Sequence, residues 1–166
     1  MSDSLAGPTK PRMTHRQVLE ALSGLLLGMF VSMLASTVVS TSLPVIIHDL
    51  DGNQTAFTWV VTATLLTTAI STPVWGKLAD LTNRKVLYQL AIVIFVLATA
   101  AAGFSTSPEM LIAFRAVQGI GAGGLAALSQ VLMADIISPR ERGRYMGLFG
   151  GVMALATVGG PLLGGV

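Results

Sequence analysis

Long apolar runs alternate with short cationic segments along this chain, and that pattern restricts it to folds that cross a membrane several times. Nine of its ten Lys and Arg residues fall into three short segments, and the tenth, Arg115, lies inside an apolar run. Because short cytoplasmic loops are enriched in Lys and Arg, we expect all three segments on the cytoplasmic side. They are the tail with Lys10, Arg12 and Arg16, the link with Lys77, Arg84 and Lys85, and the link with Arg140, Arg142 and Arg144.

Five apolar runs are long enough to cross the hydrocarbon as helices, which takes about 20 residues each. The runs are long and do not alternate with polar residues, which favours helices over a barrel. The chain is 52% hydrophobic and 11% charged, whereas soluble domains contain roughly 25% charged residues. We therefore predict an all-α integral membrane protein of the inner or plasma membrane. It has a polar cytoplasmic tail (1–20) and a bundle (21–166) with helices at about 21–47, 57–78, 86–104, 110–136 and 145–166.

The links at 48–56 and 103–109 contain no Lys or Arg, so we expect them to face outward. The fifth run reaches Val166 without a capping signal or a polar tail. We therefore expect this chain to be the front part of a longer protein, or the product of a truncated gene.

Local signals refine these boundaries. Ser107, Pro108 and Glu109 form an N-cap, a first-turn proline and an early acid, which predicts a helix start. Ser138 and Glu141 have the spacing of a capping box. In the link between the second and third helices, Asp80 lies near Lys77 and Arg84, which indicates a tight charge-paired turn in which Asn83 adopts a positive φ.

Four aromatic residues stand near the ends of the predicted spans, where a belt at the membrane interface would place them. They are Trp59, Trp75, Tyr88 and Tyr145.

Arg115 is the first candidate functional residue, because an Arg near a helix centre costs roughly 2.5 to 3.5 kcal/mol on insertion scales. Gln118 lies one turn deeper on the same face. We interpret this face as a cavity wall that carries a fixed positive charge. The alternative is that Arg115 extends toward the outer interface near Glu109.

Two other helices carry polar or flexible stripes. In the first helix Met29, Ser32, Met33, Ser36 and Ser40 share one face, and Met-rich surfaces adapt to varied apolar ligands. Ordinary packing, with each Ser bonded to its own helix, is the alternative. The second helix has a weaker stripe, to which the same alternative applies. Its members are Thr64, Thr67, Thr68 and Ser71.

Pairs of glycines four residues apart predict close helix contacts. The pairs are Gly24 and Gly28, Gly119 and Gly123, Gly147 and Gly151, and Gly160 and Gly164. Pro161 should bend the fifth helix, because it removes a backbone donor.

Several function classes are disfavoured. The cations are spread along the chain rather than gathered on one face, which argues against nucleic-acid binding. With no Cys, disulfides and thiolate metal sites are excluded. An intramembrane enzyme would need converging catalytic groups, whereas His15 and His48 lie at the ends of the first span. We expect no enzyme activity, no cofactor and no metal.

Four strings carry a family resemblance. The first two strings, with the residues that match the family motif, are GKLADLTNRK (Gly76, Leu78, Asp80, Arg84 and Lys85) and LIAFRAVQGIGAGG (Leu111, Arg115, Gln118, Gly119 and Gly121). The other two are VGGPLLGG (Gly160, Pro161, Gly164 and Gly165) and LASTVVSTSLP (Leu34, Thr37, Val39, Leu43 and Pro44). In these strings the chain resembles the N-terminal half of a major facilitator superfamily transporter, within the fourteen-helix drug:proton antiporter family.

The resemblance implies that Asp80 and Arg84 help to lock a cytoplasmic gate, that Arg115 takes part in proton-coupled charge exchange, and that Gly160 and Pro161 seal helix packing. Leu81 and Asn83 depart from the loop motif, and Ala156 replaces a glycine that is common in the fifth-helix motif. Ala35 stands where the family often has an intramembrane Asp. Since no carboxylate lies deep in any of the five runs, the protonated group would have to come from another part of the protein.

These features together predict part of a multidrug efflux antiporter that works by alternating access, with small-molecule substrates, protons, lipid and further helices as partners. The substrates would be lipophilic or cationic compounds. The cavity would be lined by Met29, Met33, Ser36, Ser40, Arg115 and Gln118. The alternatives are a metabolite transporter, such as one for an anion attracted to Arg115, and a truncated membrane protein that transports nothing.

Overall fold

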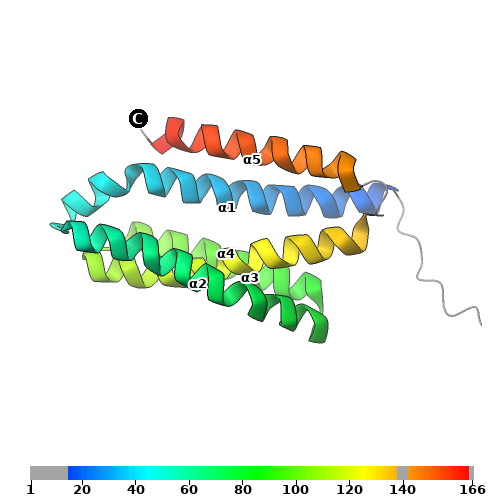
Figure 1. Cartoon of the computed structure of the whole chain (residues 1–166), viewed down its shortest axis with the longest axis horizontal. Coiled ribbons are helices and arrows are strands. Elements are labelled where there is room, and N and C mark those ends of the chain that lie inside the picture. Colours follow the sequence, from blue (N-terminus) through cyan, green and yellow to red (C-terminus); the bar gives the residue numbers. More distant parts are fainter. Residues whose placement is uncertain (1–14, 138–141, 165–166) are drawn as a thin grey trace, which may run out of the picture.

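The computed structural model describes residues 15–137 and 142–164, and these residues form five α-helices and no strand. All five helices are long and apolar enough to cross a membrane. They are α1 (His15–Asp49), α2 (Gln54–Leu81), α3 (Arg84–Gly103), α4 (Pro108–Ile136) and α5 (Arg142–Gly164) (Figure 1). The predicted all-α membrane fold is confirmed. The capping box at 138–141 and the segment 1–12 lie outside the described residues.

Helix α1 begins six residues before the first apolar run, at His15. Arg16 Nε donates to Glu20 Oε1 over 3.0 Å, and such a pair one turn apart supports an exposed helix end. The polar residues just before the apolar run therefore extend the helix rather than precede it.

Side-chain caps fix the starts of three helices. The Ser107 side chain accepts a hydrogen bond from Met110 N (3.2 Å), with Pro108 in the first turn of α4, so the predicted start of that helix is confirmed. Asn53 accepts from Ala56 N (2.9 Å) at the start of α2. Asn83 caps α3 by accepting from Lys85 N (3.0 Å) at φ −66°, so the prediction of a positive φ at Asn83 is wrong. A capping side chain makes the turn without a left-handed residue.

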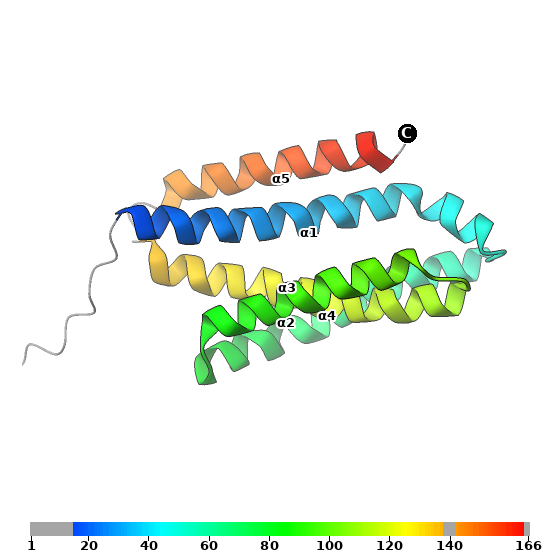
Figure 2. The same ribbon diagram turned by 180° about the vertical axis from the view of Figure 1, so that it is seen from behind.

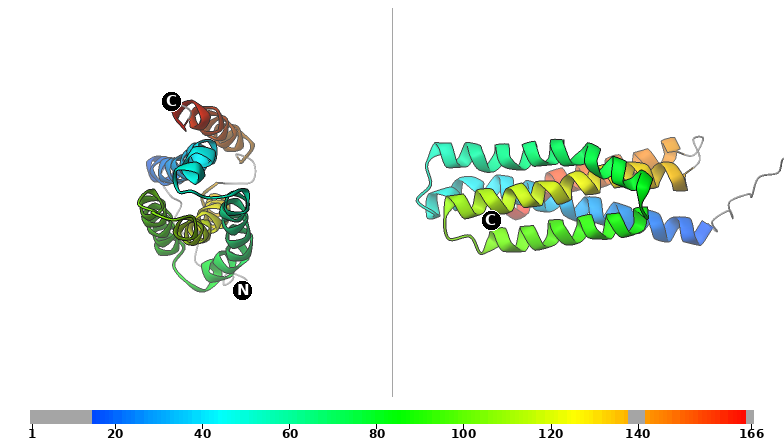
Figure 3. Two further views of the ribbon diagram at one scale, coloured as in Figure 1. Left: turned by 90° about the vertical axis from the view of Figure 1, so that its left-hand side faces the viewer. Right: turned by 90° about the horizontal axis from the view of Figure 1, so that it is seen from below.

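Helix α4 lies at the centre of the bundle. Half of its most apolar 18-residue window is buried, compared with 11 to 28% in the other four helices. It packs most extensively against α2 and α3, which lie on its two sides in the end view of Figure 3. Helix α1 lies between this three-helix group and α5, and α5 packs mainly against α1 (Figures 1 and 2).

Glycines set the close contact between α4 and α2. A Cβ added at Gly119 would lie 2.5 Å from Thr64 O, and one at Gly123 would lie 2.8 Å from Thr68 O. The α2 hydroxyls use this proximity, since Thr68 Oγ1 donates to Gly119 O (3.1 Å) and Ser71 Oγ to Ile120 O (3.4 Å). The Thr and Ser stripe of α2 thus faces α4 and bonds to its backbone, as expected for interhelical contacts built on small residues.

The other predicted glycine pairs behave differently from one another. A Cβ at Gly164 would lie 2.8 Å from Val38 O, and one at Gly28 would lie 2.5 Å from the Tyr88 hydroxyl oxygen. In contrast, Gly24, Gly147 and Gly151 have open space around the Cβ position. The spacing alone therefore does not separate glycines that lie at contacts from glycines on open faces.

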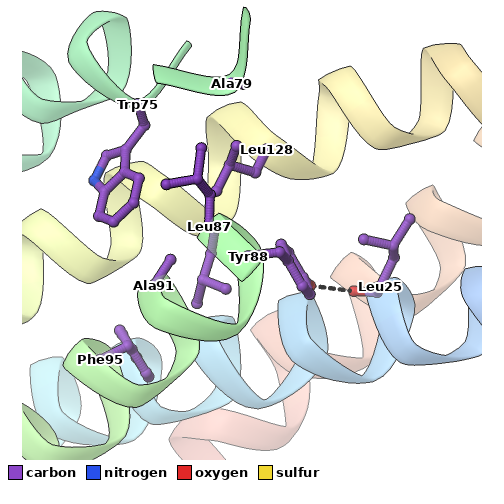
Figure 4. Close-up of a cluster of buried hydrophobic side chains, with 9 residues drawn as sticks. Leu25, Trp75, Ala79, Leu87, Tyr88, Ala91, Phe95 and Leu128 are labelled. Carbon is purple, nitrogen blue, oxygen red and sulfur yellow. Dashed lines mark hydrogen bonds between the residues drawn. The ribbon is translucent and has the colours of Figure 1, made fainter. Parts of the chain in front are cut away.

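The largest hydrophobic cluster joins α2, α3 and α4 to α1 (Figure 4). Trp75 and Tyr88 belong to it, with 5% and 7% of their surface exposed. Trp75 Nε1 donates to Ile120 O (2.9 Å), and the Tyr88 hydroxyl donates to Leu25 O (3.2 Å). The interpretation of these two residues as an interfacial belt is wrong, because a neighbouring helix offers each polar tip a carbonyl acceptor. Trp59, which is 55% exposed, has no such burial.

Candidate functional site

A cavity of about 240 Å³ lies between the helices, and all five contribute to its wall. The sequence-predicted residues Met29, Met33, Ser36, Arg115 and Gln118 line it together. The remaining lining residues are Ser32, Thr64, Phe95, Ala122, Leu125, Ala126 and Met153. The faces predicted on α1, α2 and α4 therefore contribute residues to one cavity.

Ser40 is the predicted site residue that does not line the cavity. It is exposed, and its hydroxyl donates to Ser36 O over 2.8 Å. Ser40 follows the alternative that the sequence left open, in which a helical Ser bonds back to its own helix.

Arg115 and Gln118 are almost completely buried, with 3% and 2% of their surface exposed. Arg115 Nη1 donates to Gln118 Oε1 over 2.6 Å. The guanidinium therefore reaches along α4 toward Gln118 and away from Glu109. The alternative in which Arg115 extends to the outer interface does not describe this structure.

A chain of hydrogen bonds continues from this pair into α3. Gln118 Nε2 donates to Thr99 Oγ1 (2.7 Å), and Thr99 Oγ1 donates to Phe95 O (2.7 Å). The chain holds Gln118 with its amide oxygen toward Arg115, because its nitrogen is occupied by Thr99. Sequence reasoning missed Thr99 and Phe95, since α3 carries no polar stripe and nothing in its sequence indicates which face meets Gln118.

The Arg115 Nε lies buried without a hydrogen-bond partner in the structure. Among the described residues, no carboxylate forms an ion pair with Arg115, and no residue that lines the cavity is acidic. An Arg side chain stays protonated in proteins. The cavity wall thus carries a positive charge, and the described side chain that bonds to it, Gln118, is neutral.

A second group of predicted residues lies at the link between α2 and α3. Arg84 Nη2 lies 3.8 Å from Asp80 Oδ1, and Arg84 Nη1 donates to Asp135 on α4. Arg84 Nε also donates to Ala79 O over 3.2 Å. Arg84 therefore joins the ends of α2 and α4, and Asp135 is the member of this group that motif reasoning missed.

The other predicted residues of this link make few contacts. Gly76 has open space at its Cβ position, and the side chain of Lys85 is exposed. Neither residue is held by the helices described here.

The predicted motif of the fifth helix lies against α1. An added Cβ at Gly160 would overlap Thr37, and Thr37 Oγ1 donates to Ala156 O over 3.2 Å. Ser42 Oγ donates to Gly164 O over 2.9 Å. Pro161 is exposed inside α5, and the predicted bend there stays a prediction. Gly165 lies outside the described residues.

The chain is similar to known proteins over most of its length. Residues 25–166 match the family model described as Major Facilitator Superfamily. The chain is 39% identical over 144 residues, or 87% of its length, to the multidrug transporter protein MdtP of Bacillus subtilis. It is 42% identical over 158 residues, or 94% of its length, to the efflux pump dotC of Dothistroma septosporum. The matches cover 26% and 27% of these relatives, so the chain spans about a quarter of their length.

Proposed function

Since the chain belongs to the major facilitator superfamily, whose members are transporters rather than enzymes, we propose that it forms part of a multidrug efflux transporter. The relatives named as multidrug transporter and efflux pump support this proposal. The protein would export small lipophilic molecules across the plasma membrane, with its N-terminus in the cytoplasm. Protons and further helices would be its partners.

The observation that carries the proposal is the buried Arg115–Gln118 pair on the wall of the central cavity. An intramembrane ionisable residue is expensive and usually marks a substrate or ion pathway. Helix α1 contributes Met29 and Met33 to the same wall, and their flexible thioethers can adapt to differently shaped apolar compounds. A charge beside an adaptable apolar surface suits a transporter with several substrates.

Alternating access requires an element that closes one side of the cavity. We assign this role to Arg84, which contacts Asp80 on α2 and Asp135 on α4. The group lies at the end of the bundle where α2 ends and α3 begins. Breaking it would free the ends of α2 and α4 to separate and open the cavity on that side.

Proton coupling needs a group whose protonation changes during the cycle. No acidic residue lines the cavity in the described part of the chain, and Ala35 cannot take this role. We therefore place the titrating group in helices beyond these five, with Arg115 responding to its charge.

The proposal is tested by replacing Arg115 in the complete protein. We expect Arg115→Ala to abolish energised efflux while membrane insertion stays normal, because the cavity loses its fixed charge. Efflux of a fluorescent substrate from cells measures the first effect, and the amount of protein in the membrane measures the second.

Arg16→Ala is the matched control, because that side chain is 89% exposed and pairs only with Glu20 among the described residues. Arg115→Lys shows whether charge alone suffices. Normal efflux by Arg115→Ala would contradict the role assigned to this residue.

A further inference from the structure

The charges on the cavity wall indicate the sign of the charge that a bound ligand would carry. Arg115 is 97% buried, since 3% of its surface is exposed, and its Nε has no hydrogen-bond partner among residues 15–137 and 142–164. A buried charge is costly unless it is paired and hydrogen-bonded. In the part of the chain that the structure describes, the only side-chain partner of Arg115 is the neutral Gln118. The missing partner is therefore an anion.

Other side chains of the wall neither supply that anion nor exclude it. Ser32, Ser36 and Thr64 are neutral, and Ala35, next to Ser36, packs against the main hydrophobic cluster. Hydroxyl groups can donate to an anion. A cation, in contrast, would share the cavity with Arg115, and like charges that meet in a low-dielectric site repel strongly.

Apart from Arg115, Gln118 and the three hydroxyl residues, the wall of the cavity is apolar. Along α4 its lining residues extend from Arg115 to Ala126, which is eleven residues and about 16.5 Å away. Phe95, Leu125 and Ser32 also line a second groove of about 220 Å³ between α1 and α3. The other residues of that groove are apolar or Gly: Gly24, Leu27, Gly28, Val31, Ile92 and Val96. A ligand with its charge at Arg115 would thus place an apolar body among these side chains.

The size of the cavity restricts the ligand further. Its volume of about 240 Å³ lies just below the range of about 300 to 1,000 Å³ that is common for drug-sized ligands. We infer that the cavity binds a small lipophilic monoanion, such as an aromatic carboxylate, with the anionic group on Arg115 and the ring near Phe95 and Leu125. This inference rests on the proposed transport function and narrows its substrate class. The sequence favoured lipophilic or cationic substrates and left a transporter for an anion attracted to Arg115 as an alternative.

The test is a binding measurement on the full chain in nanodiscs of zwitterionic lipid, with empty nanodiscs as the blank. The probes are 2-naphthoate, 2-naphthamide and 2-naphthylmethylammonium, which share one ring system and differ in charge. By calorimetric titration we expect naphthoate to bind at least tenfold more tightly than the amide, and the ammonium to show no saturable binding. Equal binding of the three probes, stronger binding of the ammonium, or no saturable binding of any probe would overturn the inference.

Two variants connect the preference to Arg115. Arg115→Gln should remove the preference for naphthoate over naphthamide, because it keeps a polar side chain without the charge. Ser36→Asp places a carboxylate on the cavity wall and should weaken naphthoate binding at least tenfold. Ser40→Asp is its matched control one turn away, outside the cavity, and should leave binding unchanged. Equal effects of the two aspartates would contradict the site.

Failure of this inference and failure of the proposed function give different results. Selective naphthoate binding together with no energised efflux by the complete protein would retain the anion site and reject the transport function. Arg115-dependent export of the ammonium probe but not of naphthoate would retain transport and reject the anion preference.

Discussion

At the scale of the residue, Arg115 and Arg84 are the arginines that lie buried or half-buried among the described residues, and they differ in how their charges are balanced. Arg115 bonds to the neutral Gln118 and keeps an unpartnered Nε, whereas Arg84 lies between the carboxylates of Asp80 and Asp135. The first arginine can respond to a ligand or to a titrating group, because its charge is not neutralised by the helices described here. The second holds two helix ends together. The same residue type thus supports a binding role in one place and a closing role in the other.

The closing role predicts an effect of Asp135→Asn in the complete protein. Arg84 would lose its carboxylate partner on α4 and keep its contacts on α2, the hydrogen bond to Ala79 O and the longer contact with Asp80. We expect the end of the bundle near Arg84 to open more often. In a version of the complete protein without other Cys residues, a single Cys at the cavity residue Ala126 can report access. An impermeant thiol reagent added on the cytoplasmic side should label Ala126→Cys several-fold faster with Asp135→Asn than without it.

Glu109→Gln is the control for that measurement, because Glu109 lies at the opposite end of α4 and forms no ion pair among the described residues. An unchanged labelling rate with Asp135→Asn would show that the Arg84 contacts do not close the cavity.

At the scale of the element, the glycines of α4 let neighbouring helices pack close to its backbone. Its glycines at 119, 121, 123 and 124 each lie against a neighbouring helix, and their missing side chains expose backbone carbonyls to donors on α2. Gly121 lies against α3, where an added Cβ would be 2.7 Å from Phe95 N. A helix with glycines on two faces can serve as the axis of a bundle, because both neighbours reach its backbone.

Paired glycine variants test this difference. Gly123→Ala would place a methyl group 2.8 Å from Thr68 O and against the Ser71 hydroxyl, so we expect it to destabilise the bundle by about 1 to 3 kcal/mol. Gly151→Ala meets open space and should leave stability unchanged or raise it by up to about 1 kcal/mol through helix propensity. Denaturant titration of helicity in mixed micelles measures both. Equal loss of stability in the two variants would contradict the assigned contact.

At the scale of the whole molecule, the arrangement explains both the cavity and the large exposed apolar surface. Many large apolar side chains are exposed, among them Leu65, Leu97 and Leu155, as expected where helices face lipid. The buried polar residues Arg115 and Gln118 lie between the helices, and the Arg84 group lies at one end of the bundle. The link at 82–83 and the start of α5 lie at one end of the bundle, and the link at 50–53 lies at the other (Figures 1 and 3).

This arrangement predicts opposite accessibility of the two ends across the membrane. In the Cys-free chain, Asp51→Cys should react with an impermeant thiol reagent added outside intact cells, and Lys85→Cys should react only after the membrane is opened. Both side chains are exposed in the structure, so burial does not confound the comparison. Labelling of Lys85→Cys from outside would invert the proposed orientation and move the Arg84 group to the external side.

The pattern of apolar runs predicts the five helices and their order, because a chain in lipid must satisfy its backbone hydrogen bonds within each span. The sequence also indicated which faces of α1 and α4 carry Met33, Ser36, Arg115 and Gln118, since the helical repeat fixes those faces. Tertiary structure alone decided that Thr99 and Met153 join this site and that Asp135 receives Arg84. It also buried Trp75 and Tyr88 against carbonyls of neighbouring helices. Such contacts depend on which helices are neighbours and how closely their glycines let them approach, which no local pattern encodes.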